Sequence, residues 1–146
     1  MNVAMVNRYQ TTFLLPIDIR EVNKARLSLD QELKDKEVPP KIMFQISLAL
    51  DEAMTNAIEH GASNVGDCVE LAYRFEEKTL ELSVTDSGGI VFNPEFFEQL
   101  AVIRDWGTGG RGIFLIKNYM DEVYFVFSPG KSTRIIMRKS LIETGE

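Results

Sequence analysis

The sequence predicts an α+β domain, and three features of the chain favour this class. Segments rich in β-branched and aromatic residues, typical of strands, occur near the start, in the middle and at the end of the chain. Between the first two of these regions, apolar residues recur at helical spacing over two long stretches. The length of 146 residues suits one domain with one core, so we expect residues 1–146 to form a single domain.

The N-terminal elements are expected to be one strand followed by two helices. Residues 8–16, RYQTTFLLP, have the composition of a strand. The prolines of "KEVPP" then break a first helix, because proline lacks an N–H donor and fixes its own backbone. A second helical pattern restarts near Pro40 and runs to His60, before Gly61. The apolar positions of the first helix are Ile19, Val22, Ala25, Leu29 and Leu33.

The C-terminal half is expected to combine strands with one long loop. Its predicted elements are a hairpin of strands 68–75 and 79–86, a helix at 113–120, and a strand pair at 122–128 and 132–139. Residues 87–112 are rich in glycine around a short helical segment near 94–103. This stretch is too long for a simple connection, and such loops commonly carry function.

Composition limits the compartment and the partners. The net charge of −6 disfavours non-specific binding to nucleic acid or to anionic membranes. No window approaches the length of an apolar membrane span, and Met1 begins no secretory signal, so we expect a soluble, cytoplasmic protein. The single Cys68 can form neither an internal disulfide nor a cysteine zinc cluster, and we interpret it as a buried structural thiol.

Three polar groups follow one another at four-residue intervals in "LALDEAMTNAIEHG". On a helix, Glu52, Asn56 and His60 would lie in one file among small and apolar neighbours. The carboxylate in such a place is suited to base catalysis, and the amide oxygen is a hard ligand suited to Mg²⁺. The alternative is a solvated stripe on an amphipathic helix, which spacing by itself does not exclude.

Two further stretches have the character of ligand sites. In "TDSGG", Asp86 ends a predicted strand, where its carboxylate can accept a hydrogen bond from an exocyclic amine such as adenine N6. The alternative is a turn that begins with aspartate. In "GTGGRGIFLI", a glycine-rich loop leads into a helix, an arrangement that presents N–H groups to phosphates. It lacks the lysine of a Walker A loop, and a purely structural loop is its alternative.

Together these stretches resemble the GHKL ATPase superfamily, and most closely its anti-sigma-factor serine kinases of the RsbW and SpoIIAB type. "DEAMTNAIEHG" resembles the N box of the family, "TDSGG" its G1 box and "GGRGIFLIKNYMDEV" its G2 box. The resemblance covers nearly the whole chain and implies a Bergerat fold. That fold is an α+β two-layer sandwich, in which helices cover one face of a mixed, mainly antiparallel sheet and ATP lies between the second helix and a lid.

The resemblance also implies roles for individual residues. Glu52 matches the catalytic base, Asn56 the ligand of Mg²⁺, and Asp86 the adenine-binding aspartate. The positions that match nucleotide-binding residues or lie beside the phosphates are His60, Gly88, Thr108, Gly109, Gly110, Arg111, Gly112 and Thr133. For His60 the alternative is a histidine at a helix end, favoured by the helix dipole. Residues 91–109 would form a lid that ATP orders.

The sequence departs from the family pattern in two places. Ile90 stands where the G1 box often has a second glycine, and one extra residue precedes "FNP". Glu59 stands where related histidine kinases carry lysine, and a carboxylate there cannot contact phosphate favourably. This second departure argues against a histidine-kinase-like site.

The function that follows from the resemblance is an ATP- and Mg²⁺-dependent protein-serine kinase of anti-sigma type. Its expected partners are a STAS-domain antagonist, a sigma factor and a second copy of the chain, with Phe13, Leu14 and Leu15 as candidates for the dimer surface. The alternative is a nucleotide-dependent binding module that transfers no phosphate. Histidine kinases, gyrase-like ATPases and MutL-like ATPases need further domains for which this chain leaves no room.

Overall fold

The protein was analysed as a computed structural model that describes residues 9–58, 68–86, 115–128 and 132–143. Five strands form one sheet in the order β1-β2-β3-β5-β4, and every described pairing is antiparallel. The family resemblance implied a mixed, mainly antiparallel sheet. Among the described strands, no pair is parallel. The elements are β1 (Thr11–Pro16), α1 (Ile19–Asp35), α2 (Pro40–Asn56), β2 (Cys68–Glu76), β3 (Thr79–Asp86), β4 (Glu122–Ser128) and β5 (Ser132–Ser140).

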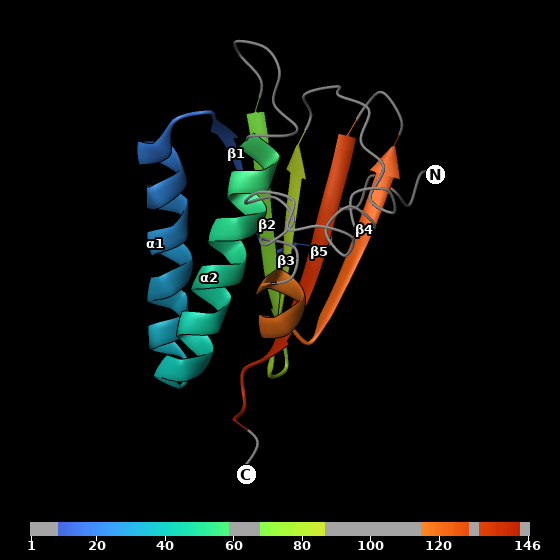
Figure 1. Ribbon diagram of the computed structural model, residues 1–146. Coiled ribbons are helices and arrows are strands. Elements are labelled where there is room, and N and C mark those ends of the chain that lie inside the picture. The colour runs from blue at the N-terminus through green and yellow to red at the C-terminus, as the bar shows by residue number, and fades with distance from the viewer. Residues whose placement is uncertain (1–8, 59–67, 87–114, 129–131, 144–146) are drawn as a thin grey trace, which may run out of the picture.

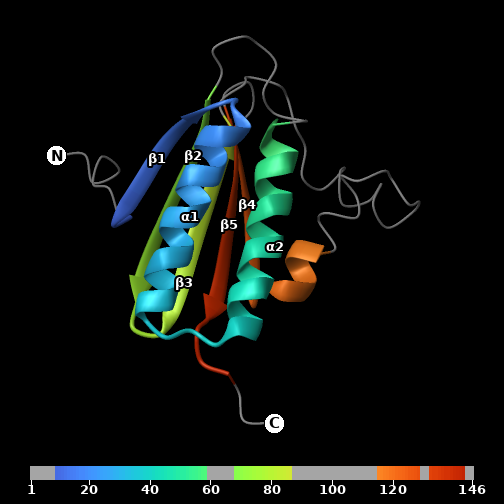
Figure 2. The same cartoon turned by 90° about the vertical axis from the view of Figure 1, so that its left-hand side faces the viewer.

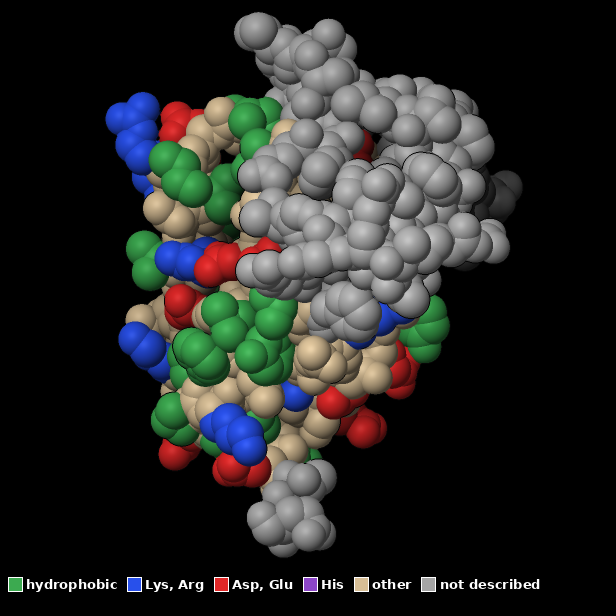
Figure 3. Space-filling view, in the orientation of Figure 1, with side chains coloured by type: hydrophobic (Ala, Val, Ile, Leu, Met, Phe, Trp, Pro, Cys, Tyr) green, Lys and Arg blue, Asp and Glu red, His purple; other side chains and the backbone are tan. Residues whose placement is uncertain are grey.

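The helices form a second layer on one face of the sheet. Figures 1 and 2 show α1 and α2 side by side in this layer, together with a short helical turn at residues 115–119. In the part of the chain that the structure describes, no helix covers the opposite face of the sheet (Figure 2), and charged side chains of both signs lie on the outer surface of the helix layer (Figure 3). The predicted α+β two-layer arrangement is therefore confirmed.

Helix α1 is amphipathic, as its spacing predicted. Asp18 caps its N-terminus, where Oδ1 accepts a hydrogen bond from the Arg20 N–H at 2.9 Å. Four of the five predicted apolar positions are buried, namely Val22, Ala25, Leu29 and Leu33. The fifth apolar position, Ile19, is the first residue of the helix and is 66% exposed.

The connection between the two helices is a Schellman motif with glutamate in place of glycine. Glu37 has a φ of 58°, in the left-handed region, and its N–H donates to the Lys34 carbonyl at 2.9 Å. The Val38 N–H donates to the Leu33 carbonyl at 3.1 Å, and both side chains are buried. Pro40 then occupies the first turn of α2, where its missing N–H costs no helical hydrogen bond.

Side chains of the strands alternate between the two faces of the sheet. In β3, Leu80, Leu82 and Val84 are buried against the helices, and they form the core with α1 and α2. The same alternation corrects the predicted dimer surface on β1. Leu15 is buried in the core and Phe13 packs against Tyr73, with ring centroids 6.4 Å apart, so only Leu14 is exposed.

The exposure of Cys68 also differs from the predicted buried thiol. Cys68 begins β2, opposite Pro16, and is partly exposed rather than buried, because the first residue of a strand lies at the rim of the sheet.

The helical segment expected near 94–103 and the lid expected at 91–109 lie outside the described residues. In the described part of the chain, no helix is long and apolar enough to cross a bilayer.

Candidate nucleotide site

Asp86 and Thr133 stand directly opposite each other at one end of the sheet. Asp86 is the last residue of β3, Thr133 is the second residue of β5, and the two are partners in the antiparallel register. Both belong to the face that the helices cover, since they follow the alternation of Val84 and Ile135. Both are also buried, with 7% and 6% of their surface exposed. The structure thus brings together a carboxylate and a hydroxyl that lie far apart in the sequence.

The C-terminal end of α2 reaches the same end of the molecule. Figure 1 shows the end of α2, the end of β3 and the start of β5 together at the top of the view. Asn56 is the last residue of α2, and Glu52 precedes it by one turn. Beyond Asn56 the chain continues into a π-type turn at Ala57 and Ile58, a feature frequent at functional sites.

The polar file predicted on α2 is more than a solvated stripe. Asn56 is 9% exposed and counts among the buried polar residues, whereas Glu52 is partly exposed. A buried amide is expensive unless it is hydrogen-bonded. The solvated-stripe alternative therefore fails at Asn56.

Two polar atoms at this end of the molecule lack a hydrogen-bond partner. Within the described part of the chain, the Asn56 Nδ2 and the Thr133 Oγ1 are buried and make no hydrogen bond. Native proteins leave few buried polar groups unpaired, and those that remain call for an explanation such as a ligand. One donor on α2 and one hydroxyl on β5, beside the carboxylate of Asp86, fit a polar ligand seated between the helix layer and the end of the sheet.

The other predicted site residues lie outside the described residues. These are His60, Gly88, Thr108, Gly109, Gly110, Arg111 and Gly112. Their roles remain predictions. Of the predicted set, the structure describes Glu52, Asn56, Asp86 and Thr133.

The sequence analysis did not identify one pair of contacting side chains, which lies on the opposite face of the sheet beside Asp86 and Thr133. Thr85 and Arg134 precede and follow the two site residues in the chain, and they are partners in the same register. The Arg134 Nε donates to the Thr85 Oγ1 at 2.9 Å, and Arg134 also forms an ion pair of 3.7 Å with Glu70. This contact braces β3 against β5 next to Asp86 and Thr133. No local pattern reveals it, because it depends on the register of two distant strands.

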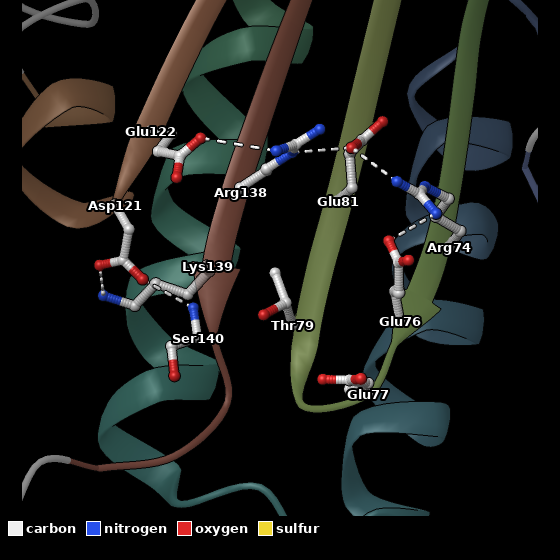
Figure 4. Close-up of a pocket in the computed structure, with 10 residues that line it drawn as sticks. All are labelled: Arg74, Glu76, Glu77, Thr79, Glu81, Asp121, Glu122, Arg138, Lys139 and Ser140. Atoms are coloured by element: carbon white, nitrogen blue, oxygen red, sulfur yellow. Dashed lines mark hydrogen bonds and ion pairs between the residues drawn. The ribbon is translucent and has the colours of Figure 1, made fainter.

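The hollow in Figure 4 is a separate feature. It measures about 420 Å³ and opens on the face of the sheet opposite the helices, at the end where β3 begins and β5 finishes. Thr79 and Ser140 line it, whereas Asp86 and Thr133 lie at the other end of the same strands. Among the described residues, no group of three or more His, Cys, Asp or Glu side chains could hold a metal ion.

Comparisons with known proteins identify the family of this chain. Residues 15–139 match the family model described as a histidine kinase-like ATPase domain. An anti-sigma F factor from Clostridium acetobutylicum is 36% identical over 102 residues, which cover 67% of this chain and 71% of that protein. The serine-protein kinase RsbW of Listeria monocytogenes is 29% identical over 140 residues, which cover 90% of this chain and 87% of that protein.

A solved structure agrees at the level of the fold. The catalytic domain of the histidine kinase ThkA superposes with a TM-score of 0.55 at 14% identity, covering 88% of this chain and 95% of that one. The family model spans most of the chain, including α2 and the ends of β3 and β5. The chain therefore belongs to the histidine kinase-like ATPase domains of the GHKL superfamily, for which a nucleotide is the expected ligand.

Proposed function

We propose that this protein is an ATP-dependent protein-serine kinase of anti-sigma type. It phosphorylates a STAS-domain antagonist, sequesters a sigma factor when that antagonist is unavailable, and acts in the cytoplasm as a homodimer. The observation that carries the proposal is that buried Asp86 and Thr133 are register partners at the end of the sheet near which α2 ends with buried Asn56. Its relatives, an anti-sigma F factor and a serine-protein kinase, support this class of reaction and partner.

In this proposal ATP binds between the C-terminal end of α2, the end of β3 and the start of β5. The Asp86 carboxylate accepts a hydrogen bond from the adenine amine, and the unpaired Thr133 hydroxyl lies beside it. The glycine loop from Gly109 to Gly112 offers backbone N–H groups to the phosphates, with Thr108 and Arg111 as neighbours. His60 and Gly88 complete the nucleotide contacts.

Asn56 is the residue that would hold Mg²⁺. Its amide oxygen is a hard ligand, and Mg²⁺ usually takes only one or two protein ligands while phosphates and water supply the rest. When bound, the ion neutralises charge on the phosphates.

Glu52 lies one helical turn from Asn56 and serves as the general base. It accepts the proton of the seryl hydroxyl of the partner as the seryl oxygen forms a bond to the γ-phosphorus. The bond between that phosphorus and the β–γ bridging oxygen breaks, and ADP leaves. Positioning and charge stabilisation account for most of the acceleration in phosphoryl transfer.

The decisive experiment follows radiolabel from ATP to the serine of a cognate STAS protein. We expect Glu52→Gln to lower the rate by about 10² to 10⁴, because glutamine keeps the shape but cannot accept the proton. ATP binding should survive in this variant. Asn56→Ala is the matched comparison, since it should weaken Mg·ATP binding and turnover together.

Two results would contradict the kinase. The wild-type protein could bind ATP and its partner without ever transferring label, or Glu52→Gln could transfer label at the wild-type rate. The first result would leave the nucleotide-dependent binding module as the function, and the second would remove Glu52 from its role.

A further inference from the structure

The sheet has a second face that no described helix covers (Figure 2), and we call it the open face. One row of strand partners crosses this face over all five strands. It consists of Thr12, Ala72, Ser83, Ile136 and Tyr124, which the register sets side by side. Because side chains alternate along a strand, these five lie opposite the face that packs on the helices. Their exposure therefore shows how far the open face is accessible to water.

Exposure changes sharply along this row. Thr12 and Tyr124, on the two outer strands, are exposed. Ala72 is 1% exposed and Ser83 0%, although both have small side chains that do not rise far above the sheet. A small side chain in the middle of an uncovered sheet keeps its outer side in water. Other atoms of the protein therefore lie over Ala72 and Ser83.

The long side chains of the adjacent row are held elsewhere. Arg74 and Arg138 turn toward Glu81 from its two sides, as Figure 4 shows. The Arg138 Nε donates to the Glu81 Oε1 at 2.8 Å, and the Arg74 Nη2 donates to the same oxygen at 3.4 Å. These contacts keep both guanidinium groups in their own row, so we look for the cover of Ser83 in another part of the chain.

The Ser83 hydroxyl is a second sign of a covering segment. Its Oγ is buried, and within the described part of the chain it makes no hydrogen bond. Buried hydroxyl groups in native proteins are nearly always paired. A length of backbone over the open face would offer both N–H and C=O groups to this hydroxyl. The burial of Ser83 and its unpaired oxygen thus have the same explanation.

The chain before β1 leaves the line of that strand. Thr11 is the first residue of β1 and pairs with Tyr73, so a straight continuation would set residue 9 opposite Phe75. The Gln10 side chain takes that place instead. Its Nε2 donates to the Phe75 carbonyl at 3.3 Å, and its Oε1 accepts from the Phe75 N–H at 3.1 Å. The backbone bends at Gln10, because a side chain now occupies the hydrogen-bonding groups of the neighbouring strand.

Tyr9 shows to which side the chain turns. The odd-numbered residues of β1 face the helices, yet the Tyr9 hydroxyl donates to the Glu81 Oε2 at 2.7 Å. Glu81 belongs to the open face and lies on β3, the middle strand of the sheet. Residues 1–8 therefore continue from a residue that already contacts the middle of the open face.

Residues 1–8 have the composition and the length for this cover. Five of the first six residues, MNVAMV, are apolar. Eight extended residues span up to about 26 Å, whereas the three strand spacings from β2 to β4 add to about 14 Å. An apolar segment gains free energy when it leaves water, and the row of Ala72, Ser83 and Ile136 offers a surface of small and apolar side chains.

We propose that residues 1–8 lie across the open face of their own chain, over Ala72 and Ser83, with Tyr9 and Gln10 as the anchor. We call this segment the N-terminal arm. It buries its apolar side chains and gives the Ser83 hydroxyl a backbone partner. The arm is an intramolecular cover, since another protein reaches the middle of this face only after the arm has moved. The inference goes beyond the proposed function and involves no residue of the nucleotide site.

The experiment measures how fast a thiol reagent reaches the covered row in the intact chain. The reporter is Ser83→Cys, combined with Cys68→Ser because Cys68 is the single cysteine of the sequence. Ala72→Cys is a second reporter on the neighbouring strand, in case the first variant fails to fold. Val126→Cys is the reference for an open thiol, because Val126 is 47% exposed on β4 of the same face. Circular dichroism verifies folding of each variant.

The covered reporters should react about 100-fold more slowly than the open one, because the reagent reaches them only during local opening of the arm. Two double variants then add carboxylates to the arm, namely Val3→Asp with Met5→Asp and Ala4→Asp with Val6→Asp. Alternate residues of an extended segment share a face, so one of these pairs faces the sheet. That pair should raise the rate at the covered reporters by about 10-fold or more.

The matched control adds the same charge to the helix layer. Leu27→Asp with Phe44→Asp changes two side chains that are each 61% exposed on α1 and α2, and it should leave the rate at the reporters unchanged. A rate that rises equally in this control would overturn the proposal, because the carboxylates would then act through general loosening of the fold.

Three further results would overturn the proposal. Equal rates at Ser83→Cys and Val126→Cys would show that the row is not covered. Unchanged protection in both arm variants would assign the cover to another part of the chain. Protection that falls on dilution would assign it to a second copy, because a contact within one chain does not depend on protein concentration.

Discussion

Asp86 is the single residue on which nucleotide affinity should depend most. Its carboxylate is buried at the end of β3, and loss of a buried acceptor leaves the adenine amine unpaired. We expect Asp86→Ala to weaken ATP binding by about 1 to 3 kcal/mol, or about 5- to 150-fold. Calorimetric titration of the variant measures this loss.

A control is needed because Asp86 is part of the sheet. Ser140→Ala lies on the same pair of strands but at the opposite end, and it should leave ATP affinity unchanged. Undiminished affinity in a folded Asp86→Ala protein would show that the adenine pocket lies elsewhere.

At the scale of a helix, the end of α1 is strained at one position. Glu37 adopts a left-handed backbone that glycine adopts without steric cost. We expect Glu37→Gly to raise the free energy of unfolding by about 0.5 to 1 kcal/mol, after the extra entropy of the unfolded chain is included. Urea unfolding measures the change.

The same substitution inside the helix is the control for Glu37. Lys34→Gly should lower the free energy of unfolding by about 1 kcal/mol, because glycine is a poor helix former. Equal destabilisation by both glycines would show that the left-handed residue carries no strain.

The contact between α1 and β2 has a pH dependence of its own. Burial, followed by the hydrogen bond to the Glu32 Oε2 at 2.6 Å, raises the pKa of Tyr73 to about 12. The folded state therefore holds this proton more tightly than the unfolded state, whose tyrosine has a pKa of about 10. The resulting stabilisation is complete below pH 10 and is lost as the pH rises from 10 to 12.

Tyr73→Phe isolates this contribution from the other groups that titrate at alkaline pH. Between pH 10 and 12 the wild-type protein should lose stability faster than the variant, by up to about 1.4 kcal/mol per pH unit. Unfolding curves collected at several pH values measure the two slopes. Equal slopes of unfolding free energy against pH for the wild-type protein and Tyr73→Phe would show that the Tyr73 hydroxyl does not contribute to this pH dependence.

At the scale of the whole molecule, ATP should stabilise the fold. The proposed site joins α2, β3 and β5, so ligand bound there favours the folded state. At 100 times the dissociation constant, the gain is about 2.7 kcal/mol, which corresponds to about 5 to 10 °C in melting temperature for a chain of this size. Thermal unfolding with and without Mg·ATP tests this, and Asp86→Ala should show a much smaller shift at the same ATP concentration.

The sequence by itself determined the local elements and three of the four described residues of the candidate site. Periodicity located both long helices and all five strands within a few residues, because the pattern of buried positions is a local property of a helix or strand. The chemistry of Glu52, Asn56 and Asp86 was also visible, since carboxylates and amides near small residues are recognisable without a fold.

Only the tertiary structure decided which residues meet. Asp86 faces Thr133, and Glu81 lies between Arg74 and Arg138, because β3 pairs with β5 across a long intervening segment. The sequence alone did not distinguish a solvated Asn56 from a buried one, or the exposed Leu14 from its buried neighbour Leu15. Register and burial result from non-local packing, and local periodicity does not specify which strands become neighbours or which face a second layer covers.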